Sequence, residues 1–221
     1  MSDFLLPVML NIRNKKCIVV GGGKVAAGKV SSLLEAGALV TVISPAVIEE
    51  LQELAHRSII VWEEKRFEPA DLAGAFLIFA ATNDGEVNLS VRRAAAPNQL
   101  VALADNPADS AFTMPSYFRR GKLTIAVSTN GASPGLARKI KQDLGSRYDE
   151  WYEAYIDFLA QARESVLRTV PCQESRRIIF KRLLGDEFME YARRKDSEGL
   201  QRLQEDLLEQ VKTDRGGGSE G

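Results

Sequence analysis

The sequence has little cysteine or histidine and no long apolar run, and each shortage argues against a class of protein. Its two cysteines, Cys17 and Cys172, are far apart and match neither a CxxC pair nor a zinc-ligand spacing, so neither a disulfide framework nor a structural zinc is expected. The single histidine, His56, lies in the surface-like segment ELAHRS and is not expected to bind a metal. No stretch approaches the ~20 apolar residues of a membrane span, and the first residues lack a signal-peptide pattern. These features predict a cytoplasmic protein that does not insert into a membrane.

The sequence also lacks a strong charge of either sign. Lys and Arg together number 29 against 30 for Asp and Glu, which argues against nucleic acid or an anionic membrane as a partner. Basic residues are nevertheless concentrated locally, because residues 119–147 hold seven of them and one acid, Asp143. Taken alone, this basic segment is typical of a solvated surface.

Two kinds of periodicity divide the 221 residues. Between residues 16 and 104, the apolar runs CIVV, LVTVI, SIIVW, AFLIFAA and QLVALA alternate with helical segments that begin at Lys24, Pro45 and Gly85. This alternation predicts an α/β fold with at least five parallel strands covered on both faces, as in Rossmann-type domains. A strand, KLTIAVST, and a helix, LARKIKQDLGSRY, follow, and the rest of the chain is predicted to be helical. We expect a Rossmann-type domain over 1–112, a small α+β segment over 113–147, a helical region over 148–215 and a flexible tail over 216–221.

A glycine-rich motif follows the first predicted strand. In VVGGGKVAAGK, Gly21, Gly23 and Ala26 fit GxGxxG/A between a strand and a helix. Gly21 allows a tight turn, Gly23 lets a pyrophosphate approach the backbone, and the small Ala26 lets the helix pack closely on the strand. The free N–H groups of the helix favour the negative phosphate. We therefore expect NAD to bind at Gly21, Gly22, Gly23, Lys24 and Val25, although a glycine turn without a ligand is the alternative.

The second predicted strand departs from the usual dinucleotide pattern. It ends with Ser44, Pro45 and Ala46, where an acidic residue normally binds the ribose diol, and no basic residue follows Ser44 to favour NADP. We expect Ser44 and the backbone at Pro45 and Ala46 to bind the adenosine ribose. Thr82 and Asn83, in the segment AATND, are expected to line the cofactor as well. A helix N-cap formed by Asn83 or Asp84 is an equally acceptable interpretation of that segment.

Several segments together resemble the precorrin-2 dehydrogenases, which also form the amino-terminal part of siroheme synthases. The resemblance lies in NKKCIVVGGGKVAAGKVSSLLEAGALVTVISP, in AATND, and in LVALADNPADSAFTMPSYFRRGKLTIAVSTNGASPGLARKIKQDL, and it covers about the first 150 residues. It implies oxidation of precorrin-2 with NAD⁺, in some members followed by insertion of Fe²⁺ or Co²⁺ into sirohydrochlorin. It also implies a homodimer whose dimerisation region is residues 113–147. One departure is Gly28, where the family usually has Arg before the residue that matches Lys29.

The resemblance assigns roles to residues outside the glycine motif. It places the family's catalytic Asp on Asp105, and the family's serine-rich stretch on Ser128 and Thr129, of which Thr129 matches a phosphorylatable serine. From the residues alone, ADNPAD would be a turn capped by Asp105. With the resemblance, Asp105 becomes the candidate base for the proton that leaves nitrogen during dehydrogenation.

The basic segment then gains a function, because precorrin-2 carries eight carboxylates. Arginine suits bidentate carboxylate contacts, so Arg119, Arg120 and Arg138 are the expected substrate-binding residues, together with Ser128 and Thr129. A helix opened by Ser133 and Pro134 could offer further N–H groups. The alternative is a non-catalytic NAD-sensing module, which would usually keep the ribose-binding acid and would not need the basic segment.

Overall fold

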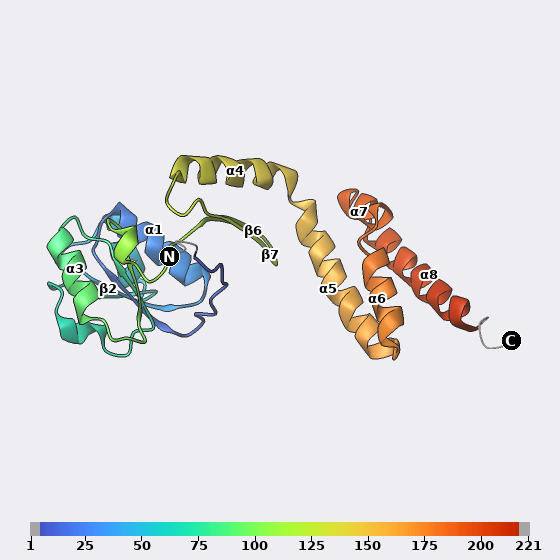
Figure 1. Ribbon diagram of the computed structural model, residues 1–221, viewed down its shortest axis with the longest axis horizontal. Helices are drawn as coiled ribbons and strands as arrows, with labels where there is room; N and C mark the ends of the chain where they lie inside the picture. Colours follow the sequence, from blue (N-terminus) through green and yellow to red (C-terminus); the bar gives the residue numbers. More distant parts are fainter. Residues whose placement is uncertain (1–4, 217–221) are drawn as a thin grey trace. The chain divides into compact units, whose positions relative to one another are not determined.

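The computed structural model describes residues 5–216, with side chains described as far as residue 211, and the chain forms two units. One unit extends to Met114 and the other begins at Pro115 (Figure 1). The tail expected over 216–221 lies, apart from residue 216, outside the described residues. No helix of the described part of the chain is long and apolar enough to cross a membrane.

The first unit is built on a parallel sheet of five strands in the order β3-β2-β1-β4-β5, which confirms the Rossmann-type prediction. The third strand is shorter than the apolar run SIIVW that predicted it. Ile59 donates its backbone N–H to Leu54 in the preceding helix, and Ser58 adopts a left-handed φ of 56°, so this part of the run closes the helix and pairing starts at Val61. The strands are β1 (Lys16–Val20), β2 (Leu39–Ile43), β3 (Val61–Glu63), β4 (Leu77–Ala80) and β5 (Leu100–Leu103).

Helices cover both faces of this sheet, as the nearly continuous apolar strands predicted. On one face Val19, Val42 and Phe79 pack with α1 (Lys24–Glu35) and α2 (Glu49–His56). On the other, Ile18 and Ile78 pack with α3 (Gly85–Ala94) and the 3₁₀ turn η1 (Pro69–Leu72), and a second 3₁₀ turn, η2 (Pro107–Asp109), follows β5. The helix expected to begin at Pro45 was misplaced, because residues 44–48 form a loop and α2 begins at Glu49.

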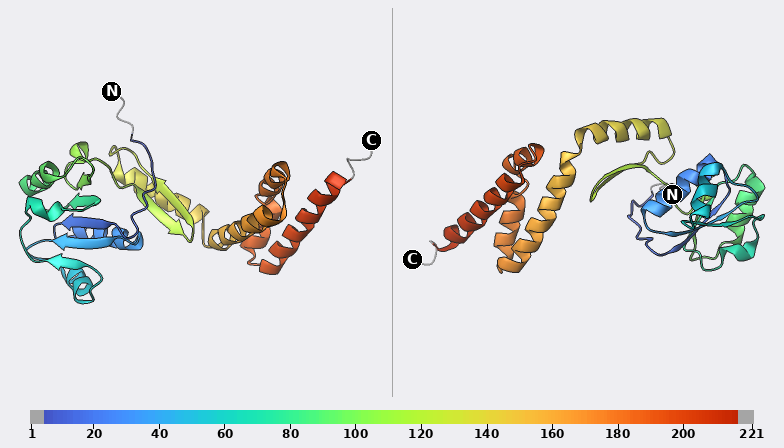
Figure 2. Two further views of the ribbon diagram at one scale, coloured as in Figure 1. Left: turned by 90° about the horizontal axis from the view of Figure 1, so that it is seen from below. Right: turned by 180° about the vertical axis from the view of Figure 1, so that it is seen from behind.

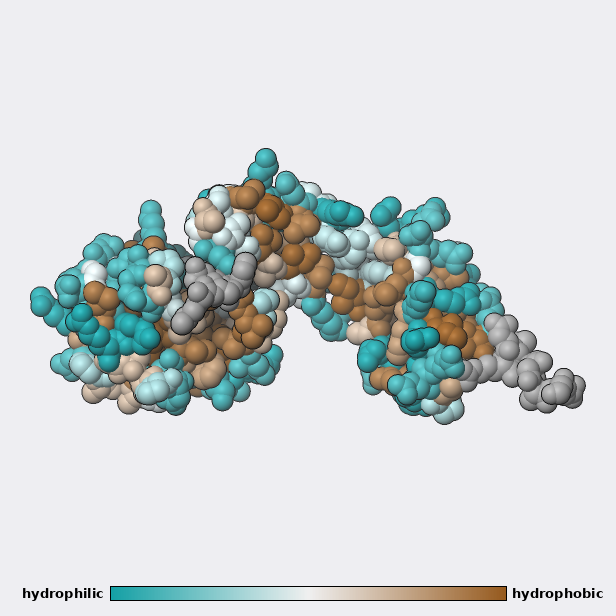
Figure 3. Space-filling view, viewed as in Figure 1, coloured by the Kyte–Doolittle hydropathy of each residue, from teal (hydrophilic) through white to brown (hydrophobic). Residues whose placement is uncertain are grey.

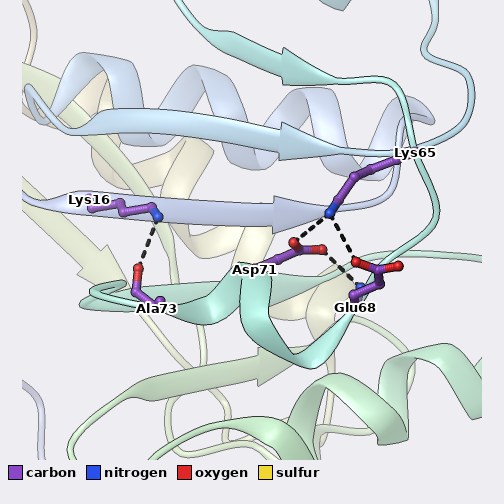
Figure 4. A network of polar contacts seen from close by, with 5 residues as sticks. All are labelled: Lys16, Lys65, Glu68, Asp71 and Ala73. Carbon is purple, nitrogen blue, oxygen red and sulfur yellow. Dashed lines mark hydrogen bonds and ion pairs between the residues drawn. The ribbon is translucent and has the colours of Figure 1, made fainter.

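Polar contacts hold η1 where the chain crosses from β3 to β4. Lys65 forms ion pairs with Asp71, at 2.7 Å, and with Glu68, and its hydrogen bond to Asp71 raises the pKa of the ammonium (Figure 4). Lys16, at the start of β1, donates to the carbonyl of Ala73 at 2.9 Å. These contacts help to place β4 beside β1, on the opposite side from β2.

The second unit contains a two-stranded antiparallel ribbon and five helices among its described residues. The ribbon pairs β6 (Ser116–Arg120) with β7 (Leu123–Val127), and β6 was not predicted. Helix α4 (Pro134–Arg147) packs on both strands. The remaining helices are α5 (Trp151–Thr169), α6 (Gln173–Arg182), α7 (Asp186–Arg193) and α8 (Ser197–Gly216).

The helices α5–α8 share one apolar core. Trp151, Tyr155 and Val166 of α5 are buried in it, and the Tyr155 hydroxyl donates to the Leu183 carbonyl at 2.7 Å. Helices α7 and α8 are separated at Lys195, which has a left-handed φ of 58°.

Candidate functional site

The strand order reverses between β1 and β4, so the topological switch point of the sheet lies at the carboxyl ends of these two strands. From β1 the chain continues through β2 to β3 on one side, and it returns to β4 on the other side. Loops that leave neighbouring strands in opposite directions at such a point separate, and open α/β sheets bind ligands there. The glycine turn directly follows β1 and therefore lies at this position.

The three glycines of the turn meet different surroundings. Gly21 has φ +123°, and a Cβ there would overlap the Ala81 carbonyl oxygen, so this position requires glycine. A Cβ on Gly22 would overlap the Ala46 carbonyl oxygen and lie 2.9 Å from Ser44 Oγ. Gly23 has nothing within 4 Å of the position of a Cβ. The turn is thus tightly enclosed at Gly21 and Gly22 and open at Gly23, where the motif places a pyrophosphate.

The N-terminus of α1 lacks the cap that a nearby helix has. Gly23 occupies the N-cap position without a side chain to accept from the first turn, and the first turn holds no acidic residue. In α3, by contrast, the Asp84 carboxylate accepts from the backbone N–H groups of Glu86 and Val87. Lys24 and Val25 are both exposed on the first turn of α1. A bound anion would therefore supply the acceptor that α1 lacks, so the residues fit a dinucleotide pyrophosphate.

The loop after β2 lies against the glycine turn, as its predicted cofactor role requires. The Ile48 N–H donates to the Gly22 carbonyl at 2.9 Å, which brings Ser44, Pro45 and Ala46 beside the turn. The Ser44 side chain is buried, however, and its hydroxyl donates to the Ala46 carbonyl at 2.7 Å. Trp62 holds the same loop from β3 by donating to the Ser44 carbonyl. Backbone groups of this loop are therefore better placed than the Ser44 hydroxyl to contact a ribose.

The AATND loop is locked by a residue that the sequence did not reveal. Asn88 is fully buried, its side-chain oxygen accepts from the Thr82 N–H and hydroxyl, and its side-chain nitrogen donates to the Thr82 carbonyl. The helix cap is formed by Asp84, so Asn83 remains exposed and has no capping role. The one sequence feature that could have indicated this role is the position of Asn88, an asparagine in the first turns of a helix that follows a polar loop.

Asp105 stands beside this loop rather than serving as a cap. Its Oδ2 lies 3.5 Å from the position of a Cβ on Gly85, at the start of α3. The turn in ADNPAD is capped by Asn106, whose side-chain oxygen accepts from the Asp109 N–H, so the interpretation of Asp105 as the cap was wrong. The Asp105 carboxylate is exposed and makes no hydrogen bond or ion pair with another described residue, which leaves it available to accept a proton.

The expected substrate-binding residues all lie in the second unit, four of them at the two ends of the β6–β7 ribbon and Arg138 on α4. Arg119 is exposed near the hairpin, whereas Arg120 is half-buried and donates to the Arg119 carbonyl. Ser128 and Thr129 follow β7 at the opposite end, where their hydroxyls accept from the N–H groups of residues 130 and 133. Arg138 is exposed on α4. The ribbon therefore separates the arginine pair from the serine–threonine pair by the length of β7.

The helix that follows this turn begins as predicted. Ser133 is its N-cap and accepts from the Leu136 N–H, with Pro134 in the first helical position. Of the other basic residues of the segment, Lys122 forms a 2.8 Å ion pair with Asp157 of α5. Within the described residues no three His, Cys, Asp or Glu side chains gather as a metal site. A hollow of about 670 Å³ lies at the opposite, amino-terminal edge of the sheet, near Lys16 and Gly74, and does not belong to this site.

Comparison with protein families gives two matches along the chain. Residues 8–116 match a family described as NAD(P)-binding, and residues 120–147 match one described as the central part of a sirohaem biosynthesis protein. The first match contains the glycine turn and both loops that surround it.

Individual relatives match most of the chain. A precorrin-2 dehydrogenase from Priestia megaterium is 35% identical over 82% of this chain and 90% of its own length. A siroheme synthase from Nitrosomonas europaea is 40% identical over 84% of this chain, and the matched part is 39% of that protein. The solved structure of SirC, a precorrin-2 dehydrogenase, matches with a TM-score of 0.77 and 32% identity, over 95% of this chain and 100% of SirC. The chain thus spans about two fifths of the siroheme synthase and nearly all of the dehydrogenases.

Proposed function

The chain belongs to the precorrin-2 dehydrogenase family, and on that premise we propose how its residues support the NAD-dependent oxidation of precorrin-2 to sirohydrochlorin in siroheme biosynthesis. The observation that carries the assignment is the uncapped N-terminus of α1, preceded by a turn that is closed at Gly21 and Gly22 and open at Gly23. NAD⁺, when bound, accepts the hydride that leaves a ring-bridging carbon. The N–H groups of α1 bind its pyrophosphate, and the loops 44–46 and 82–83 line its other parts.

Asp105 is the proposed catalytic base. Dehydrogenation releases a proton from nitrogen together with the hydride, and a carboxylate without an internal partner can accept it. The geometry that supports this role is local: Asp105 follows β5, beside the start of α3, at the edge of the sheet where the glycine turn lies. Arg119, Arg120, Arg138, Ser128 and Thr129 are proposed to bind the substrate's carboxylates, with the exposed arginines contributing most.

The activity is tested with purified protein, precorrin-2 and either NAD⁺ or NADP⁺, by following NADH formation and the sirohydrochlorin spectrum. We expect turnover with NAD⁺. Asp105→Asn should retain NAD⁺ binding and lose at least ~100-fold in kcat, the usual contribution of a general base. Glu86→Gln, which removes another exposed carboxylate near the start of α3, is the matched control and should keep wild-type kcat. Equal kcat for Asp105→Asn and the control would remove Asp105 from the mechanism.

We further propose that the protein acts as a homodimer and inserts Fe²⁺ or Co²⁺ into sirohydrochlorin as substrate metal. The second activity is favoured by the siroheme synthase relatives, whose named product contains the metal, and by the free carboxylate of Asp105, which could accept pyrrole protons as the metal enters. An anaerobic assay with sirohydrochlorin and Co²⁺ decides it. A rate no faster than the spontaneous insertion would leave the protein with dehydrogenase activity alone.

A further inference from the structure

The hollow at the amino-terminal edge of the sheet lies where three segments of the first unit meet. The chain passes this edge just before β1, between η1 and β4, and between α3 and β5, because all five parallel strands begin there (Figure 2). Lys16 on its rim and Gly21 in the glycine turn are separated by the length of β1, roughly 16 Å. The volume of the hollow, about 670 Å³, is within the range of small-molecule sites. It is therefore large enough for a ligand and separate from the cofactor site.

Hydrogen bonds fix the walls of the hollow. The Gln99 side-chain nitrogen donates to the carbonyls of Leu72, at 2.6 Å, and Ala75, at 3.0 Å. The side-chain oxygen of the same residue accepts from the Ala96 N–H at 2.9 Å. Five alanines and a glycine line the space between these contacts, and their side chains are too short to fill it. The hollow is thus preformed without a ligand, as small-molecule sites usually are.

The lining of the hollow is positively charged. Lys15 and Lys16 both line it, and no Asp or Glu of the described residues does. The acid within η1, Asp71, is outside the lining and pairs with Lys65 at 2.7 Å. Exposed lysines alone are ordinary, since hydrophilic side chains cover much of the first unit on the face that Figure 3 shows. Two lysines that share one hollow without an acid favour an anionic ligand.

The polar groups on the rim have unused hydrogen-bonding capacity. The Lys15 ammonium forms no ion pair or hydrogen bond with any residue that the structure describes, and the side chain is exposed. Lys16 donates one of its three N–H groups to the Ala73 carbonyl at 2.9 Å, which leaves two (Figure 4). The side-chain amides of Asn14 and Asn98 are exposed and make no hydrogen bond within the described part of the chain. An anion could therefore bind here without breaking a contact of the fold.

An apolar surface lies next to these donors. Phe76 is half-buried and Leu72 is buried, and both line the hollow together with the alanines. The Lys15 ammonium lies 5.9 Å from the centre of the Phe76 ring, so a positive charge and an aromatic surface are adjacent. A ligand that combines an anionic group with an apolar body would contact both.

We propose that this hollow binds an organic anion. Lys15 and Lys16, with the amides of Asn14 and Asn98, hold its carboxylate or phosphate group, and its apolar body lies against Phe76. The proposal does not depend on the dehydrogenase function. Because the hollow and the glycine turn lie at opposite edges of the sheet, the anion and NAD⁺ can be bound at the same time.

Titration of the full chain with benzoate and with phenyl phosphate tests the site, with saturating NAD⁺ present to occupy the cofactor site. Amide NMR spectra locate each probe, whether or not NAD⁺ binds. We expect saturable shifts at residues 14–16, 74–76 and 98–99 for both anions. Benzyl alcohol, the neutral counterpart, should bind at least about 10-fold more weakly, because it lacks the charge-assisted hydrogen bonds.

The outcomes of this titration separate the two parts of the proposal. Absence of saturable shifts at these residues for both anions would refute the site. Benzyl alcohol that binds as tightly as the anions would refute the preference for an anionic group. Tighter binding of benzoate than of phenyl phosphate would support a carboxylate ligand, and the reverse order would support a phosphate.

Two variants on the rim provide the second measurement. Lys15→Gln removes an ammonium that the fold does not use, and Asn98→Asp adds a negative charge with little change of shape. Each should raise the Kd of both anions about 10-fold, the effect of one charge-assisted hydrogen bond, and leave binding of benzyl alcohol unchanged. Lys181→Gln, at an exposed position on α6, makes the same change of charge as Lys15→Gln and should leave every Kd unchanged. Unaltered Kd values in both rim variants would refute the placement of the anionic group.

Discussion

Alanine substitutions at three glycines near the cofactor site should have three different effects. A Cβ on Gly22 would meet the backbone of the loop after β2, and neither the Ala46 carbonyl nor Val47 Cα can move without displacing that loop. Gly23→Ala adds a methyl group to open space at the N-cap, and Gly28→Ala adds one on the exposed side of α1. The series therefore separates a cost to folding from a cost to cofactor binding.

The magnitudes follow from these surroundings. Gly22→Ala should cost about 3 kcal/mol, the upper part of the range for overpacking, because the overlap is with backbone rather than with a flexible side chain. For a unit of this size that lowers the melting temperature by roughly 10 °C. Gly28→Ala should stabilise by about 1 kcal/mol through helix propensity. Gly23→Ala should change stability by less than about 1 kcal/mol and raise the Kd for NAD⁺ at least ~10-fold, which corresponds to 1.4 kcal/mol.

Thermal melting without cofactor and isothermal titration with NAD⁺ measure the two effects separately. Gly28→Ala is the control for adding a methyl group to α1, and it should bind NAD⁺ as the wild type does. A Gly22→Ala protein that melts with the wild type would refute the enclosure argument. Unchanged NAD⁺ affinity in Gly23→Ala would show that the pyrophosphate does not approach this turn.

Three further expectations concern buried groups. Asn88→Leu removes the three hydrogen bonds that lock Thr82. It should therefore lower the free energy of unfolding by about 2–4 kcal/mol and weaken NAD⁺ binding. Scanning calorimetry would measure the first loss and titration with NAD⁺ the second. Burial raises the pKa of the Cys17 thiol to about 11, so this thiol should resist a disulfide reagent at pH 8 until the protein is unfolded; rapid labelling of native protein would contradict its burial. Burial also raises the pKa of Tyr155 to about 12, above the ordinary value of 10, so the folded state favours the neutral phenol. Its contribution to stability should be complete below pH 10 and be lost as the pH rises toward 12, and denaturant unfolding of Tyr155→Phe should show a smaller loss over that interval.

Local features of the chain were predictable because they depend on neighbouring residues. The run CIVV followed by three glycines and a helical period predicted β1, the turn and α1, and Ser133 with Pro134 predicted the start of α4. Strand β6 escaped prediction because SYFRR is short, ends in two charged residues and does not alternate clearly between apolar and polar side chains. Its pairing partner β7 stabilises it.

The family resemblance supplied Asp105, but the residues around it could not show whether that side chain was free. The answer depended on Asn106, which takes the capping role and leaves the Asp105 carboxylate without a partner in the part of the chain that the structure describes. Asp105 and Asn106 are adjacent and have similar capping ability, so local sequence preference does not show which of them caps the turn that begins at Pro107.

Periodicity and turn chemistry therefore establish a parallel sheet, a glycine turn after its first strand and an uncapped helix that suits an anion. They do not reveal that Gly22 is enclosed by the loop after β2, that Asn88 locks the loop after β4, or that a ribbon separates Arg119 and Arg120 from Ser128 and Thr129. Those contacts join residues that are distant in the chain, and they form only because the strand order places the ends of particular strands side by side.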